Sequence, residues 1–217
     1  MTLPSLLALI ALAQDAPVEI PKPELPAKAE CAVCVAVGSG HGVERVAAGF
    51  RYQGKNLYLC NSAEAKRLKE NPDAYLPPIL PRPMPELGLA DFSGKRWDAA
   101  AVAGKVVLVD FWATWCGPCK EMFPVLKRVR AKYAAQGFEI LSVSVDEKLA
   151  DLQSFLKKQP LANPVLHDES GVFAKWRVVA VPTFFLVKDG QVVAQWPGKV
   201  SEKTLSDAVA KALAPKG

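Results

Sequence analysis

Hydrophobic and polar positions after Leu87 follow two alternating patterns. Short runs rich in apolar and β-branched residues predict strands, and longer segments with apolar residues at helical spacing predict helices between them. The expected elements are strand 106–114, helix 116–135, strand 138–145, helix 149–158, strands 183–187 and 192–196, and helix 202–213. Asp189-Gly190 is typical of a tight hairpin turn between the last two strands. This order predicts one α/β domain.

A smaller pattern lies between two proline-rich segments. Residues 43–52 and 56–60 predict strands joined across Gln53-Gly54-Lys55, and residues 62–70 predict a helix that ends at Asn71-Pro72. The prolines on either side indicate stiff connecting segments. The expected organisation is a proline-rich lead-in over 14–27, a small module over 28–76, a proline-rich linker over 77–86 and the α/β domain over 87–217.

The N-terminus has the pattern of a targeting segment. Residues 3–13 are uncharged and apolar, and they end in Ala11-Leu12-Ala13, a small-x-small cleavage pattern. This stretch is too short to span a bilayer, so it predicts a secretory signal over residues 1–13, with the mature chain starting at Gln14. We therefore expect a periplasmic or extracellular protein, tethered to the membrane if the leader is not cleaved.

Composition narrows the classes of function. Of the 217 residues, 50% are hydrophobic and 23% charged, which is typical of a globular protein and excludes a disordered chain. The net charge is +5, but no run of five basic residues occurs. A nucleic-acid partner is therefore not expected.

The strongest chemical signal is Cys116-Gly117-Pro118-Cys119, which follows an apolar strand and begins a helix. Unpaired N–H groups at a helix N-terminus favour negative charge, so the pKa of the Cys116 thiol should be lowered. We expect Cys116 to be the exposed attacking nucleophile and Cys119 the resolving thiol. A structural metal site is the first alternative, but Cys31 and Cys34 lie more than eighty residues away. A structural disulfide is the second.

Asp110 interrupts the apolar run 106–112, so its carboxyl group is expected to be buried. Burial raises the pKa of a carboxyl group and can make it a proton acceptor near neutral pH. The alternative is an aspartate that points to solvent at the end of a strand.

Residues 109–120, which read VDFWATWCGPCK, resemble the active-site signature of the thioredoxin superfamily, and Pro124 matches its helix-bending proline. The resemblance covers residues 84–215. It implies a thioredoxin-like fold, with a mixed central sheet flanked by helices. Residues 91–96 and 142–146 are most similar to the TlpA/ResA-like branch of extracytoplasmic thiol-disulfide oxidoreductases, which are mostly reductants. The cytochrome-maturation members of that branch carry a glutamate where this chain has Ala90.

The resemblance also implies roles for individual residues. Asp110 would assist proton removal from Cys119, and Val181-Pro182-Thr183 resembles the cis-proline loop that offers backbone hydrogen bonds to a bound chain. The expected catalytic and substrate-binding residues are Cys116, Cys119, Asp110, Pro182, Trp115, Gly117, Pro118 and Val181, with Trp112 either at the site or in the core. The partners would be disulfide-containing proteins and a membrane or periplasmic electron donor. No cofactor is expected to be needed for catalysis.

Residues 31–76 resemble the YHS domain, a small metal-associated α+β module. The similarity rests on Cys31-Ala32-Val33-Cys34, on the stretch 52–60 that ends in Cys60, and on residues 71–75. Glu64 stands in place of the fourth thiol of that family. Three thiolates could hold copper or zinc, with Glu64 or His41 completing the site. Alternatively, Cys31 and Cys34 form a disulfide, and Glu64 closes a capping box with Asn61.

Two rival functions follow from these features. One is copper handling, in which the thioredoxin-like domain keeps metal-ligand thiols reduced while the small module carries the metal. The other is thiol peroxidase activity, but the sequence offers no separate peroxidatic cysteine.

Overall fold

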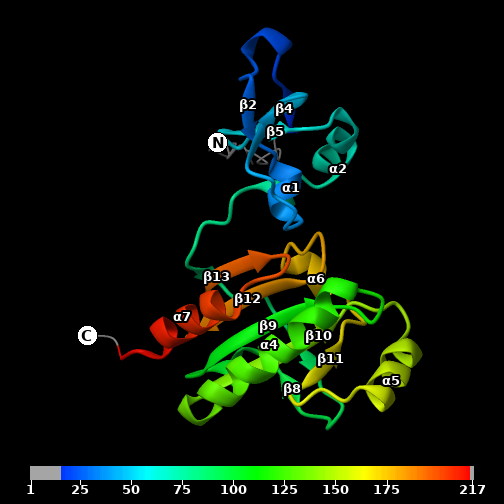
Figure 1. The fold of residues 1–217 in the computed structure, drawn as a ribbon, viewed down its shortest axis with the longest axis vertical. Helices are drawn as coiled ribbons and strands as arrows, with labels where there is room; N and C mark the ends of the chain where they lie inside the picture. The colour runs from blue at the N-terminus through cyan, green and yellow to red at the C-terminus, as the bar shows by residue number, and fades with distance from the viewer. Residues whose placement is uncertain (1–15, 216–217) are drawn as a thin grey trace, which may run out of the picture. The chain divides into compact units, whose positions relative to one another are not determined.

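The computed structural model describes residues 16–215, so the leader expected over residues 1–13 lies outside the described part. The chain forms two compact units (Figure 1). The first contains residues 16–32 and Gly42–Leu76, and the second contains Val33–His41 and the chain from Pro77 onwards. Within residues 16–215, no helix combines the length and apolar character needed to cross a membrane.

The first unit is built on two small antiparallel sheets. β1 (Val18–Glu19), β4 (Ala48–Tyr52) and β5 (Lys55–Leu59) form one, and β2 (Lys28–Glu30) and β3 (Val43–Arg45) form the other. The single strand expected over 43–52 is therefore wrong, because the chain changes sheets between Arg45 and Ala48.

Short helical segments lie between and after these strands along the chain. They are η1 (Lys22–Glu24), α1 (Ala32–Ala36), η2 (Ser62–Glu64), α2 (Ala65–Glu70) and η3 (Pro72–Tyr75). One of them, α1, runs into the Val33–His41 segment of the second unit. The helix expected over 62–70 is present as η2 and α2, and Asn71 ends it as predicted. Phe50, Leu57, Leu59 and Leu68 are buried.

A six-stranded mixed sheet forms the second unit, in the order β11-β10-β9-β12-β13-β6 (Figure 1). Its strands are β6 (Arg82–Pro83), β9 (Val106–Trp112), β10 (Phe138–Ser144), β11 (Val165–His167), β12 (Thr183–Lys188) and β13 (Gln191–Pro197). β9, β10 and β11 are parallel, whereas β12 is antiparallel to β9 and to β13. This topology confirms the thioredoxin-like fold.

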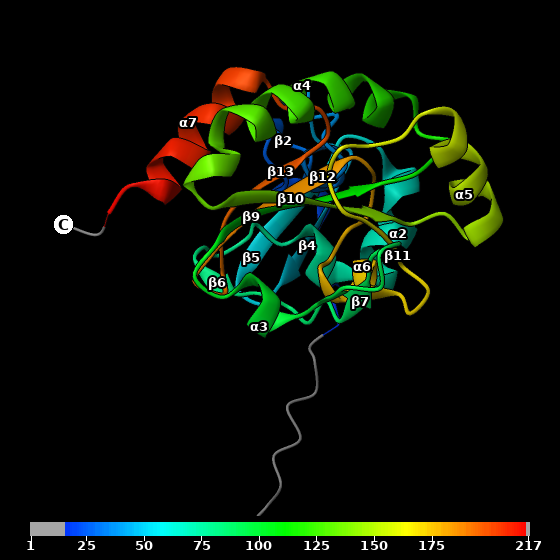
Figure 2. The same cartoon turned by 90° about the horizontal axis from the view of Figure 1, so that it is seen from below.

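Helices cover both faces of the sheet, as Figure 2 shows: α4 and α7 lie together on one face, and α3 and α6 lie on the other. The helices are α3 (Ala99–Val102), α4 (Gly117–Tyr133), η4 (Ala134–Gln136), α5 (Leu149–Lys158), α6 (Val172–Lys175) and α7 (Glu202–Leu213). A hairpin of β7 (Leu89–Ala90) and β8 (Arg96–Trp97) precedes α3.

Side-chain alternation along β9 separates two hydrophobic cores. Leu108 and Trp112 belong to the core under α4 and α7, whereas Val107, Val109 and Phe111 belong to the core on the other face. All seven residues of β9 are buried, as expected for a central strand covered on both faces.

Both proline-rich segments contribute to sheets, which the expected lead-in and linker did not include. Val18–Glu19 pairs with β4, and Arg82–Pro83 pairs with β13. Proline is tolerated there because an edge strand does not need every backbone N–H. β11 and α6 were not predicted either, since segments of three and four residues carry little periodicity.

Candidate active site

Cys116 and Cys119 lie where β9 leads into α4. Cys116 is the N-cap of α4, and its Sγ atom accepts a hydrogen bond of 3.1 Å from the backbone N–H of Cys119. The helix therefore begins at Gly117, one residue later than expected. The two sulfur atoms are joined in a disulfide, with an S–S distance of 1.99 Å.

Cys116 is less accessible than the sequence suggested. It was expected to be exposed, but in the disulfide form only 4% of its surface is exposed, and only 1% of that of Cys119. The reason is a tertiary contact, because the Sγ atom of Cys116 lies 3.6 Å from the carbonyl oxygen of Val181. Trp115, by contrast, is 70% exposed beside the pair.

The Val181–Pro182 peptide bond is cis, as the sequence resemblance implied. Neighbouring hydrogen bonds fix this loop. The carbonyl oxygen of Pro182 accepts the N–H of Gly198 at 2.7 Å, and the Thr183 hydroxyl donates to the carbonyl oxygen of Ala180 at 2.8 Å. The loop thus holds the backbone of Val181 against Cys116.

Gly117 and Pro118 occupy the first turn of α4, and both are exposed. A Cβ atom added to Gly117 would meet no other atom within 4 Å. The space over Gly117, which follows Cys116 in the chain, is therefore open.

Asp110 is buried, which confirms the expectation and shows that the solvent-facing alternative was wrong. Only 1% of its surface is exposed, and it shares the α4 side of β9 with Leu108 and Trp112. Burial raises the pKa of Asp110 to about 7, although the hydroxyl of Ser142, which donates to its Oδ2 atom at 3.0 Å, opposes this rise.

Trp112 belongs to the core and not to the surface of the site. It is fully buried and packs edge-on against Phe123, with ring centroids 5.1 Å apart. Its indole Nε1 atom is buried and has no hydrogen-bond partner among the described residues.

Sequence reasoning missed Asp146, which fixes the loop before Cys116. Its carboxylate is buried and accepts hydrogen bonds from the Thr114 backbone N–H, the Thr114 hydroxyl and the Ser144 hydroxyl. The available signal was an acidic residue directly after a buried strand.

Cys31, Cys34 and Cys60, the predicted metal ligands, have sulfur atoms that all lie within 4.8 Å of one another. Glu64 instead pairs with Arg67 at 3.4 Å. Asn61 caps the following turn through the N–H of Ala63, whereas His41 is exposed.

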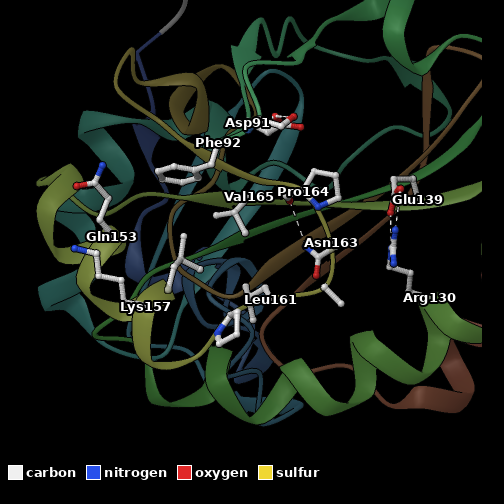
Figure 3. Close-up of a pocket in the computed structure, with 14 residues that line it drawn as sticks. Asp91, Phe92, Arg130, Glu139, Gln153, Lys157, Leu161, Asn163, Pro164 and Val165 are labelled. Carbon is white, nitrogen blue, oxygen red and sulfur yellow. Dashed lines mark hydrogen bonds and ion pairs between the residues drawn. The ribbon is translucent and has the colours of Figure 1, made fainter.

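A separate pocket of about 790 Å³ lies beside β11 and α5 (Figure 3). Its lining includes Asp91, Arg130, Glu139, Lys157 and Asn163. Arg130 and Glu139 form an ion pair of 2.6 Å on one wall. The lining does not include Cys116 or Cys119.

Known proteins share this domain. Residues 81–195 match the sequence profile of the AhpC/TSA family. The thiol-disulfide oxidoreductase ResA of Bacillus thuringiensis subsp. konkukian is 33% identical over 129 residues, which cover 58% of this chain and 75% of the relative. ResA of Bacillus subtilis is 31% identical over 156 residues, which cover 71% of this chain and 82% of the relative. A structure from Chlorobium tepidum, assigned as a DsbE thiol:disulfide interchange protein, is 32% identical with a TM-score of 0.58, covering 62% of this chain and 97% of that one.

Proposed function

This chain belongs to the AhpC/TSA family, and on that premise we propose that it is an extracytoplasmic thiol-disulfide oxidoreductase that reduces disulfides in proteins. Its relatives named ResA are thiol-disulfide oxidoreductases. The observation that carries the proposal is the Cys116–Cys119 disulfide at the start of α4, with the Cys119 N–H directed at the Cys116 sulfur.

Reduction would begin from the dithiol form of this pair. The Cys119 N–H and the other unpaired N–H groups of the first turn favour the Cys116 thiolate over the thiol. That thiolate attacks one sulfur of the substrate disulfide, which forms a mixed disulfide and releases the other sulfur as a thiolate.

Cys119 completes the reaction. It loses its proton to Asp110 and attacks the Cys116 sulfur, so the mixed disulfide breaks and the Cys116–Cys119 disulfide forms. The substrate leaves with two reduced sulfurs, and two electrons have moved from the enzyme to it. A donor dithiol must then reduce the enzyme again. Asp110 suits this role because its pKa of about 7 lets it accept and return a proton near neutral pH.

Four residues are proposed to contact the substrate. Gly117 leaves open space, Val181 presents a backbone carbonyl next to Cys116, and Trp115 and Pro118 are exposed apolar residues close to Cys116 in the chain. Pro182 holds the Val181 backbone in place.

Trapping the mixed disulfide tests the mechanism. Cys119→Ser should accumulate a covalent adduct with a disulfide-containing substrate protein, and the adduct should disappear on treatment with dithiothreitol. Cys116→Ser, the matched control, should form none. Equal trapping by both variants, or by neither, would overturn the assignment of Cys116 as the nucleophile.

The direction of electron flow is tested by the reduction potential of the pair. A value near about −270 mV, as in thioredoxin, supports a reductase, whereas a value near about −120 mV, as in DsbA, would make the protein an oxidant. The extracytoplasmic location rests on the leader pattern of residues 3–13. Cell fractionation with mass spectrometry of the N-terminus tests it, and recovery in the cytoplasm with Met1 intact would refute it.

A second candidate function is metal binding at a YHS-like module, supported by the grouping of the Cys31, Cys34 and Cys60 sulfur atoms within 4.8 Å. Thiolates in such a group suit a soft ion such as Cu(I), or Zn²⁺. Titration of the reduced full chain with Cu(I) against a competing chelator should show one tight site. The site should be lost in Cys31→Ser/Cys34→Ser and kept in Cys116→Ser/Cys119→Ser. Equal affinity in both double variants would exclude it.

A further inference from the structure

Asp110 is the first of three residues joined by side-chain hydrogen bonds. Ser142, in β10, donates its hydroxyl to Asp110 Oδ2 at 3.0 Å, and Asn163 Nδ2 donates to the Ser142 oxygen at 2.8 Å. β10 and β11 pair in parallel, and the Ser142 N–H donates to the carbonyl oxygen of Pro164 at 3.0 Å. This pairing brings Asn163, the residue before Pro164, close to Ser142. Asn163 therefore enters the network from the segment that leads into β11.

The donors and acceptors in this network allow one arrangement. The carbonyl oxygen of Pro164 can only accept, and it lies 3.3 Å from Asn163 Nδ2, so the amide presents its NH₂ group to both Pro164 and Ser142. Since the Ser142 oxygen accepts from Asn163, its single proton is left for Asp110. If the hydroxyl pointed its proton at Asn163 instead, two hydrogen-bond donors, the Ser142 O–H and the Asn163 NH₂ group, would face each other.

We propose that Ser142 and Asn163 are positioning residues for the redox step, which hold a hydrogen-bond donor against the carboxylate of Asp110 and so favour its ionised form. The inference rests on the proposed role of Asp110 as the proton acceptor for Cys119. Their side-chain hydrogen bonds are to Asp110, to each other and to the carbonyl oxygen of Pro164, and not to the reacting sulfur atoms. They act through Asp110 alone.

Among the groups around Asp110, the Ser142 hydroxyl, oriented by Asn163, is the main one that stabilises the ionised carboxylate. Burial and the Ser142 hydrogen bond are the causes of its pKa shift, and no charged side chain is among them. β12 places the apolar Phe184 opposite Asp110. On the same face, the start of α4 brings the Cys116–Cys119 disulfide into this core, and its sulfur atoms titrate only after reduction. A donated hydrogen bond is therefore the interaction that favours the carboxylate in an apolar site.

Asn163 connects this buried network to the pocket shown in Figure 3. The charged groups on the pocket wall are Asp91, Arg130, Glu139 and Lys157. Arg130 and Glu139 pair with each other. Asn163 thus lines the pocket and is also connected to Asp110 through Ser142. A substitution at Asn163 can therefore change the pKa of Asp110 without altering the cysteine pair.

Titration of the Asp110 carboxyl group by ¹³C NMR, in the oxidised protein, tests the inference directly, with Asp110→Asn used to assign the signal. Ser142→Ala should move its midpoint upward by about one to two pH units, because a hydrogen bond to the charged form is lost. Ser142→Thr keeps the hydroxyl and should restore the wild-type midpoint.

Asn163 variants test the orienting role. Asn163→Ala should raise the midpoint less than Ser142→Ala does, because the hydroxyl is then free to turn but is still present. Asn163→Asp should raise it more than Asn163→Ala, since the new carboxylate attracts the Ser142 proton and adds negative charge. An unchanged midpoint in Ser142→Ala and Asn163→Asp, with circular dichroism showing both folded, would overturn the inference.

The pH dependence of substrate reduction separates this inference from the proposed function. If both hold, the inflection of the rate profile moves with the NMR midpoint in each variant. If the NMR midpoint moves but the rate profile of Asp110→Asn equals that of the wild type, Asp110 is not the base and the proposed function of Asp110 fails. If Asp110→Asn alters the profile but Ser142→Ala moves neither quantity, the positioning role fails.

Discussion

Asp146 accepts hydrogen bonds from both the backbone N–H and the hydroxyl of Thr114, at 2.9 Å and 2.7 Å. These two contacts tie the end of β10 to the loop that leads into Cys116. A third hydrogen bond, from the Ser144 hydroxyl, goes to Oδ2, the oxygen that also accepts the Thr114 N–H. Since β9 and β10 are neighbouring parallel strands, their carboxyl ends meet here, and the position of the cysteine pair depends on this tie.

Asp146→Ala should lower the free energy of unfolding by about 3 kcal/mol, because three donors lose a charged acceptor in a buried place. We expect the rate of substrate reduction to fall as well, since the loop before Cys116 loses its anchor. Urea unfolding and insulin reduction measure the two effects.

Asp98→Ala is the matched control for Asp146→Ala, because Asp98 caps α3 through the Ala101 N–H on the opposite face of the sheet. It should cost about 1 kcal/mol of stability and leave the rate unchanged. An Asp146→Ala variant that keeps the full rate would show that the tie serves stability alone.

The buried carboxyl group of Asp110 predicts a stability that falls as pH rises. Its pKa is about 7 in the folded protein against 3.8 for the ordinary group, so between these values the folded state binds the proton and the unfolded state does not. The stabilisation is complete below about pH 4 and is lost as pH rises through 7, by at most about 4 kcal/mol.

Asp110→Asn removes this titration. The oxidised variant should be more stable than the wild type at pH 8, and the difference should shrink towards pH 4. Denaturant unfolding at several pH values between 4 and 8 measures it. Parallel stability curves for the two proteins would contradict the burial of a titrating carboxyl group.

Trp115 is predicted to serve substrate binding more than stability, because it is 70% exposed next to Cys116. Trp115→Ala should raise KM for a protein substrate several-fold and change the free energy of unfolding by less than about 0.5 kcal/mol. Phe92→Ala, at an exposed aromatic residue of the β7–β8 turn, should change neither. A similar rise of KM in both variants would deny Trp115 a specific role.

Gly190 and Gly117 are predicted to have different roles. Gly190 allows a backbone conformation, whereas Gly117 leaves space for the substrate. Gly190 has φ +71° in the hairpin turn, so Gly190→Ala should cost about 1 kcal/mol of stability and leave reduction unaffected. Gly117 lies in open space at the start of α4. Gly117→Ala should keep stability but slow the reaction with protein substrates, because the new methyl group stands in the approach to Cys116. Equal rates for wild type and Gly117→Ala with a protein disulfide would show that the approach lies elsewhere.

Long elements and local chemistry were predictable from sequence because their signals are local. Leu149–Lys158 and Glu202–Leu213 form helices with the expected bounds, and Asp189 and Gly190 both have the positive φ values of a tight hairpin turn. The redox pair was recognisable because a Cys-x-x-Cys motif and its strand-to-helix position lie within one stretch of chain. The burial of Asp110 followed from the apolar residues around it.

Contacts between these local features and residues distant in sequence depend on the tertiary fold. The sequence determined the cysteine pair, the buried acid and the α/β order, because each depends on neighbours along the chain. It did not determine that Val181 lies against Cys116, that Asp146 holds Thr114, or that Ser142 and Asn163 reach Asp110. Those contacts depend on strand order and register, which are set by packing of the whole sheet and not by any short stretch of residues.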